Sequence, residues 1–200
     1  MNMQMKDRTK VMFAVALEEL LEEMPLEKVR VARLCERCGA AAPTFYYYFH
    51  DKYELVAWMF LQDFAGEFGN KEPGYTAGGL NQVTIRMAKR RNFYKKAFND
   101  HGQNSITEYW IAFNMQISRD AVLFHTGKEL SKDQEYAIKY HIYGILGMFR
   151  EWLYTDNMTT EYMTAFLYQR TPDFLKEAFS VFPFSTDNIL SRAGKNTKKS

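Results

Sequence analysis

Apolar residues recur every three or four positions along most of the chain, which is the spacing of amphipathic helices. In the first such segment, 9–23, Phe13, Leu17 and Leu20 share one stripe. Pro25 ends this segment, because proline disfavours a helical conformation in the residue before it. No segment shows the strict alternation of a half-buried strand. The pattern therefore predicts an all-α protein with about nine helices.

Stop and start signals divide the rest of the chain into helices. Gly39 is a typical helix C-terminal stop, and Asp51-x-x-Glu54 and Ser131-x-x-Gln134 are typical capping boxes. The glycine-rich segment 69–79 is predicted to be a loop. Further helices are predicted over 31–38, 42–49, 52–68, 80–90, 92–99 and 105–126, after Ser131, after Thr159 or Thr160, and again after the interruption at 171–173.

The first three of these segments follow the order helix, short helix, glycine turn, short helix. This is the helix-turn-helix arrangement, which places its second short helix in the major groove of DNA. In the helix predicted over 42–49, Phe45 and Phe49 are four residues apart and should face inward. The other side chains are then offered outward, where hydroxyl and methyl groups can contact bases and phosphates. The predicted contacts are Pro43, Thr44, Tyr47 and Tyr48.

Lys52 stands in the first turn of the next predicted helix. A cation beside helix N-terminal amides favours a phosphate group. We therefore expect Lys52 to contact the DNA backbone.

The run from Thr44 to Tyr48, followed by Asp51, Lys52 and Leu55, resembles the DNA-binding signature of TetR/AcrR transcriptional regulators. The resemblance covers about residues 8 to 60 and includes the turn glycine at position 39. It implies a dimeric, all-α protein with a C-terminal ligand and dimerisation domain, and it adds Arg30 and Tyr46 to the expected DNA contacts. The family often has serine or threonine at position 41 and a longer base-reading side chain at 42, whereas this chain has alanine at both.

The segments 51–58, 143–147 and 151–153 resemble a narrower branch of that family, the dihydroxyacetone-kinase regulator-like proteins. We expect a helix-turn-helix domain over 1–52, an effector-binding and dimerisation domain over 53–190, and a loose tail over 191–200. Glycines in this second domain would let a helix of a second copy approach closely, as in a four-helix dimer interface. These glycines are Gly144 and Gly147.

Aromatic residues of the later helices could line an effector pocket between helices, or they could be ordinary core. The candidates for a pocket are Tyr109, Trp110, Phe113, Tyr140 and Tyr143. A dense basic run, with lysine or arginine at 89, 90, 91, 95 and 96, is either a solvated helix face or a site for an anion.

Charge leaves a second function open. The chain has a net charge of +2, and residues 1–58 carry eight Lys/Arg against nine Asp/Glu. A nucleic-acid module is expected to carry a basic face. An effector-sensing adaptor that keeps this fold but acts mainly through a protein partner is therefore the alternative to a DNA-binding regulator.

Other chemistry finds little support in the sequence. Cys35 and Cys38 form a single C-x-x-C without a second pair, and the four histidines lack a ligand spacing. We expect no metal, no cofactor and no enzymatic activity. Because no apolar run approaches the roughly 20 residues of a membrane span, we expect a cytoplasmic protein with no membrane partner.

Overall fold

The computed structural model describes residues 5–68, 75–100, 105–155 and 158–191. Over these residues the chain forms eleven α-helices and one short 3-10 helix, and no strand. The expected all-α class is confirmed, with a few more helices than the nine expected. The elements are α1 (Met5–Glu23), η1 (Leu26–Lys28), α2 (Val31–Cys38), α3 (Ala42–Tyr48), α4 (Lys52–Phe68), α5 (Ala77–Lys89), α6 (Arg91–Phe98), α7 (Ile106–Thr126), α8 (Lys132–Tyr154), α9 (Thr160–Gln169), α10 (Asp173–Val181) and α11 (Thr186–Leu190).

Local signals set most of these boundaries. Gly39 ends α2 in the left-handed conformation, with φ of 64°, which costs a residue without a Cβ little. The hydroxyl of Ser131 accepts from the Gln134 amide in a complete capping box at the start of α8, as predicted. The Thr76 hydroxyl caps α5, so this helix begins three residues earlier than expected. The short helix α11 was not predicted.

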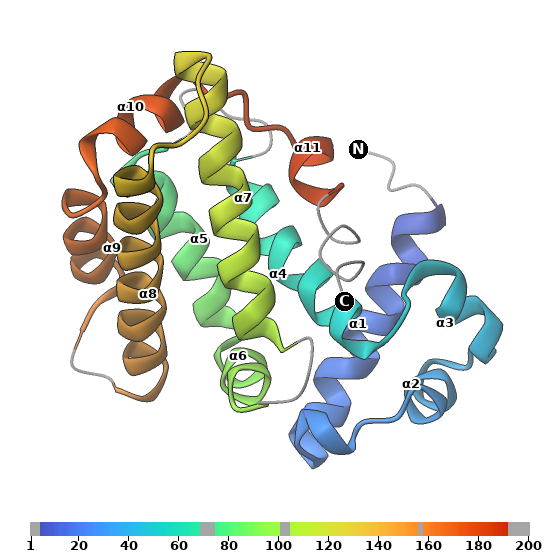
Figure 1. Cartoon of the computed structure of the whole chain (residues 1–200). Coiled ribbons are helices and arrows are strands. Elements are labelled where there is room, and N and C mark those ends of the chain that lie inside the picture. The colour runs from blue at the N-terminus through green and yellow to red at the C-terminus, as the bar shows by residue number, and fades with distance from the viewer. Residues whose placement is uncertain (1–4, 69–74, 101–104, 156–157, 192–200) are drawn as a thin grey trace.

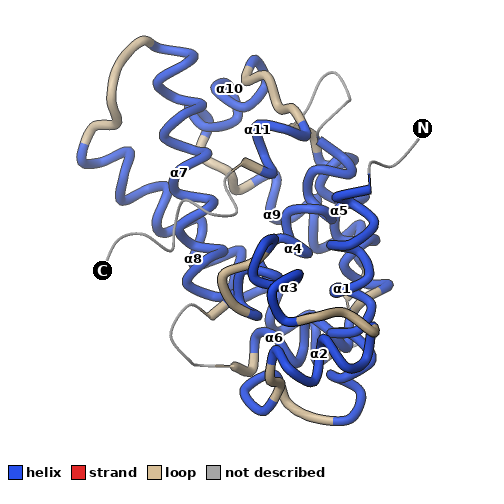
Figure 2. Tube along the Cα trace, turned by 90° about the vertical axis from the view of Figure 1, so that its right-hand side faces the viewer, coloured by secondary structure: helices blue, strands red, loops and turns tan. Residues whose placement is uncertain are grey.

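The helices form two groups joined by α4. Figure 1 shows α1, α2 and α3 on one side of the molecule and α8, α9 and α10 on the other. Helix α4 packs against α1 and also against α5, α7 and α11. Figure 2 views the molecule from the α1–α3 side and shows α3 in front of α4. Helix α4 begins at Lys52 and contacts helices of both groups. The expected domain boundary at residue 52 therefore stays a prediction.

Each group has its own aromatic core. The ring of Phe13 meets Phe45 edge-on at 5.1 Å in the first group. In the second, Phe60 of α4 meets Phe113 of α7 at 5.6 Å. The expected tail after residue 191 lies outside the described residues. None of the described helices is long and apolar enough to cross a membrane.

Candidate DNA-binding surface and internal cavity

Helix α3 is fixed to the protein by its two phenylalanines. Phe45 is fully buried against Phe13, and the ring of Phe49 meets that of Trp58 in α4 at 5.9 Å. Ala41, at the N-cap, provides no side-chain cap, and Pro43 occupies the first turn, where its missing amide proton is not needed. The inward pair expected from the sequence is therefore present.

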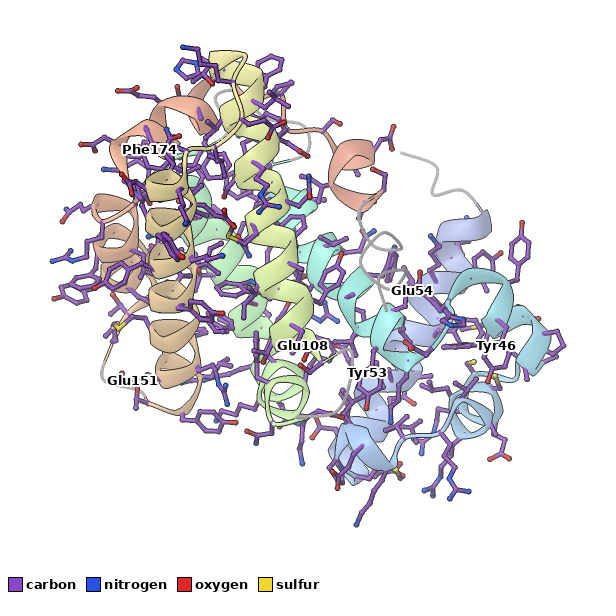
Figure 3. The ribbon with its side chains drawn as sticks, in the orientation of Figure 1. Tyr46, Tyr53, Glu54, Glu108, Glu151 and Phe174 are labelled. Carbon is purple, nitrogen blue, oxygen red and sulfur yellow. The ribbon has the colours of Figure 1, made fainter. Side chains whose placement is uncertain are left out.

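The remaining side chains of α3 form an outward-facing aromatic surface. Tyr46 is 58% exposed and Tyr47 is 69% exposed, while Tyr48 and Thr44 are half-buried. The rings of Tyr47 and Tyr48 meet edge-on at 4.8 Å. Figure 3 places Tyr46 on the α1–α4 side, far from Glu151 and Phe174. The expected contact residues of α3 thus lie together, and Arg30 is exposed at the N-cap of α2, which packs on α3.

Lys52 does not present a free ammonium group. Its Nζ donates to three backbone carbonyls of the turn around η1, at 2.7 Å to Leu26, 3.0 Å to Glu27 and 3.0 Å to Val29. Burial lowers the pKa of Lys52, although nearby carboxylates oppose the shift. An ammonium group has three protons, and this one uses all three to tie the start of α4 to η1. In this structure Lys52 thus holds the start of α4 against η1. The phosphate contact expected at Lys52 stays a prediction.

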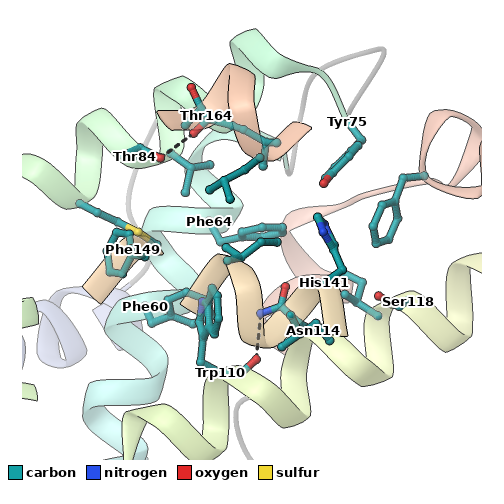
Figure 4. A pocket seen from close by; sticks show the side chains of 18 of the residues that line it. Phe60, Phe64, Tyr75, Thr84, Trp110, Asn114, Ser118, His141, Phe149 and Thr164 are labelled. Carbon is teal, nitrogen blue, oxygen red and sulfur yellow. Dashed lines mark hydrogen bonds between the residues drawn. The ribbon is translucent and has the colours of Figure 1, made fainter. Parts of the chain in front are cut away.

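A cavity of about 110 Å³ lies inside the second group of helices. Figure 4 shows side chains converging on it from several helices, among them Phe60, Trp110, His141 and Thr164. Of the five aromatic residues predicted to line an effector pocket, Trp110 alone lines this cavity.

The other four residues expected around an effector pocket do not line this cavity. Tyr140 is 85% exposed and Tyr143 is 58% exposed, because they lie on the opposite side of α8 from the buried Ile138 and Ile142. Tyr109 and Phe113 are buried but do not line the cavity. Their rings pack in the core against Phe60, at 6.4 Å and 5.6 Å.

Polar groups of the cavity wall differ in whether they have partners. The Thr84 and Thr164 hydroxyls donate to carbonyls within their own helices, and the Asn114 amide donates to the Trp110 carbonyl at 2.8 Å. His141 Nε2 is buried and has no hydrogen-bond partner within the described residues. Burial, with a smaller contribution from the charge of Lys176, lowers the pKa of His141 to about 4. The sequence around His141 carries no motif, so it gave no sign that a cavity lies beside this residue.

In the basic run at 89–96 the two arginines contact other elements of the same chain. Arg90 pairs with Glu18 of α1 and, at 2.9 Å, with Asp63 of α4. The Arg91 guanidinium donates to carbonyls at the end of α8, those of Trp152, Leu153 and Thr155. Arg90 and Arg91 thus join distant elements of the fold, and anion binding by the basic run stays a prediction.

The cysteines take part in packing. Cys35 is buried, and the Cys38 thiol is partly buried and donates to the Leu34 carbonyl at 3.1 Å. Burial raises the pKa of both thiols. Across the part of the chain that the structure describes, no group of three or more His, Cys, Asp or Glu residues is arranged to hold a metal ion.

Helix α2, the turn at Gly39 and the exposed helix α3 form a helix-turn-helix, the arrangement by which one class of transcription regulators binds DNA. The sequence model described as bacterial regulatory proteins of the tetR family matches residues 15–59, and the one described as a transcriptional regulator C-terminal region matches residues 77–172. The chain belongs to the TetR family, whose members regulate transcription and are not enzymes.

Individual relatives support the same conclusion. The HTH-type dhaKLM operon transcriptional activator DhaS of Lactococcus lactis subsp. lactis (strain IL1403) is 26% identical over 101 residues, which are 49% of this chain and 53% of that protein. The chain thus matches about half the length of this curated relative.

Two solved structures share the fold. The dihydroxyacetone kinase operon activator DhaS has a TM-score of 0.54 at 20% identity, over 88% of this chain and 98% of that one. A tetR-family transcriptional regulator from Streptomyces coelicolor has a TM-score of 0.50 at 17% identity, over 96% and 90%. The resemblance to the dihydroxyacetone-kinase regulator branch is supported by the relative from Lactococcus lactis.

Proposed function

We propose that this TetR-family protein is a cytoplasmic homodimer that binds operator DNA through α3 and is controlled by a small molecule bound in the internal cavity. The observation that carries the proposal is the presence, in one chain, of an exposed helix α3 and an internal cavity, with α4 and α6 between them. The relative from Lactococcus is named as an operon activator. Activation and repression would use the same DNA-binding surface.

The surface of α3 suits duplex DNA. Tyr46 and Tyr47 present hydroxyl groups that can reach phosphate oxygens, and Thr44 offers a hydroxyl and a methyl group to base edges. Arg30 supplies a cation from the start of α2. Pro43 and Tyr48 complete the surface. Lys52 would support DNA binding indirectly, by holding the start of α4 against η1.

The exposed face of α8 suits a second copy of the chain. Tyr140 and Tyr143 are large exposed apolar residues next to Gly144 and Gly147, and a Cβ added at either glycine would meet nothing within 4 Å. Such a face, with small residues beside aromatic ones, lets a partner helix approach closely. A two-fold dimer would present two copies of α3 to major grooves about 34 Å apart.

A chain of polar contacts links the cavity to the DNA-binding helices. Tyr94 lines the cavity, and its hydroxyl donates to Asp63 of α4. Asp63 also pairs with Arg90 at 2.9 Å, and Arg90 pairs with Glu18 of α1. A ligand that displaces Tyr94 would change the contacts that position α1, and so favour one of two arrangements of the paired α3 helices.

The DNA-binding proposal is tested by a mobility-shift assay on the promoter of the chain's own gene. Tyr47→Ala should weaken binding at least severalfold, because it removes an exposed side chain of α3. Tyr162→Ala is the matched control, since Tyr162 is 63% exposed but lies on α9. Affinity should also fall steeply with salt. The logarithm of the binding constant should fall linearly with the logarithm of the salt concentration, with a slope of about −0.9 for each phosphate contacted. Equal binding by both variants and the parent would overturn the role of α3.

The adaptor that acts through a protein partner is the second candidate. The exposed tyrosines of α8 favour it, because a partner protein could cover them as well as a second copy could. Failure of the parent protein to shift its own promoter, together with a monomeric state in sedimentation, would favour this alternative.

A further inference from the structure

One ring nitrogen in the cavity wall is buried without a hydrogen-bond partner among the described residues. His141 is 9% exposed, and its Nε2 has no hydrogen-bond partner within the described residues, whereas neighbouring polar groups such as Thr84, Thr164 and Asn114 are already paired. In Figure 4 the imidazole lies beside Phe64 and Tyr75 among the lining side chains. A buried polar group without a partner is costly, so a native structure that keeps one often has a use for it.

The charge of the cavity wall limits what can enter. Among the described lining residues there is no aspartate, glutamate, lysine or arginine. Because burial holds the His141 imidazole neutral at physiological pH, it offers no charge either. A charged ligand would lose its hydration without gaining an ion pair, which is strongly unfavourable. The cavity wall therefore suits an uncharged molecule.

The size and lining of the cavity limit the rest of the molecule. Its volume is about 110 Å³, and an apolar cavity of roughly 150 Å³ is known to hold a benzene molecule. Aromatic and aliphatic side chains dominate the wall, with Phe60, Phe149 and Ile142 among them. The space suits about one ring or a short branched chain.

We propose that the cavity takes an uncharged, mainly apolar molecule of about this size, whose single hydroxyl or similarly compact polar group pairs with His141 Nε2. The inference rests on the proposed function only in treating this molecule as the effector. A hydroxyl serves either tautomer of His141, because it can both donate and accept.

The test compares three probes of nearly one size: phenol, benzene and benzoate. Isothermal titration calorimetry at pH 7 measures their dissociation constants for the full chain. Phenol should bind about tenfold more tightly than benzene, since it satisfies the buried Nε2. Benzoate should show no measurable binding. In His141→Phe the preference for phenol over benzene should vanish.

Control variants keep the result interpretable. His125→Phe makes the same exchange at an exposed histidine in the last turn of α7 and should leave the tenfold preference intact. Circular dichroism establishes that His141→Phe is folded. If it is not, His141→Gln serves, which keeps a hydrogen-bonding group and should retain part of the preference.

Several outcomes would overturn the proposal: equal binding of phenol and benzene by the parent, tight binding of benzoate, a preference that survives in His141→Phe, or no binding of any probe at millimolar concentration. A separate mobility-shift assay without probes tests DNA binding. A chain that shifts its promoter but fails the probe test loses the ligand assignment alone, so the two failures are distinguishable.

Discussion

At the scale of single residues, Lys52 shows that one sequence pattern is compatible with two roles, a phosphate contact and a contact within the fold. The sequence places a lysine in the first turn of a helix, where it could contact phosphate. The fold brings three carbonyls of the η1 turn within 3.0 Å of its Nζ. That turn lies more than twenty residues earlier in the chain, so local sequence could not predict the contact.

Replacing Lys52 with methionine should lower the free energy of unfolding by about 1–3 kcal/mol, because three carbonyls of the η1 turn lose a charged donor. Lys52→Arg should not restore stability, since a planar guanidinium does not fit three converging acceptors. Urea unfolding followed by circular dichroism measures the change. Lys28→Met, at an exposed lysine of η1, is the control and should change stability little. Unchanged stability in Lys52→Met would contradict the anchoring role.

His141 predicts how stability depends on pH. Its pKa in the folded protein is lowered to about 4 by burial, against about 6.5 in the unfolded chain. Below pH 6.5 the unfolded chain takes up a proton that the folded protein refuses, so the folded state loses stability as the pH falls from about 6.5 to 4. Thermal unfolding of His141→Phe should show a shallower decline over this window. A decline identical to that of the parent would rule out this source.

At the scale of elements, helix existence was predictable and helix orientation was not. Caps such as Ser131 and breaks such as Pro172 act within a few residues, so the sequence indicated most helices of the fold correctly. In α8, however, apolar residues occupy two faces. Tyr140 and His141 are adjacent in sequence, yet one is 85% exposed and the other is buried. Which face turns inward depends on the neighbouring helices.

Arg91 should stabilise the end of α8 from a distance. The last carbonyls of a helix accept no hydrogen bond from within the helix. The Arg91 guanidinium donates hydrogen bonds to such carbonyls at the end of α8. We expect Arg91→Met to lower the free energy of unfolding by about 1–3 kcal/mol. It should also speed hydrogen exchange in the last turn of α8. Lys89→Met, at an exposed residue of the same basic run, should do neither. Slow exchange in both variants would argue against this role.

At the scale of the whole molecule, the helix-turn-helix group was predictable because its signature is confined to one short stretch. The cavity was not, since its wall combines residues from helices throughout the second group. Of the five aromatic residues expected around an effector pocket, Trp110 lines this cavity and the other four do not. The exposed face of α8 was not predictable either, because it depends on which other face of the helix packs inward.

Gly147→Ala tests whether the exposed face of α8 is a dimer interface. In an isolated subunit alanine should stabilise the helix by about 0.5–1 kcal/mol, and a Cβ there meets nothing within 4 Å. If a second copy packs against this face, the added methyl group should weaken the dimer, seen as a higher dissociation constant in sedimentation equilibrium. Gly78→Ala in α5, where a Cβ meets only the Thr76 hydroxyl at 3.9 Å, should leave dimerisation unchanged. Tighter association of Gly147→Ala would place the interface elsewhere.

The contacts of Arg90 have a consequence for the ligand as well as for DNA. Because Glu18, Asp63 and Tyr94 connect α1 with the cavity wall, any influence through them works in both directions. Thermodynamic reciprocity requires that a ligand which weakens operator binding by a given factor is itself weakened by that factor when the operator is bound. Promoter DNA would then set how much of the small molecule the protein needs before it responds.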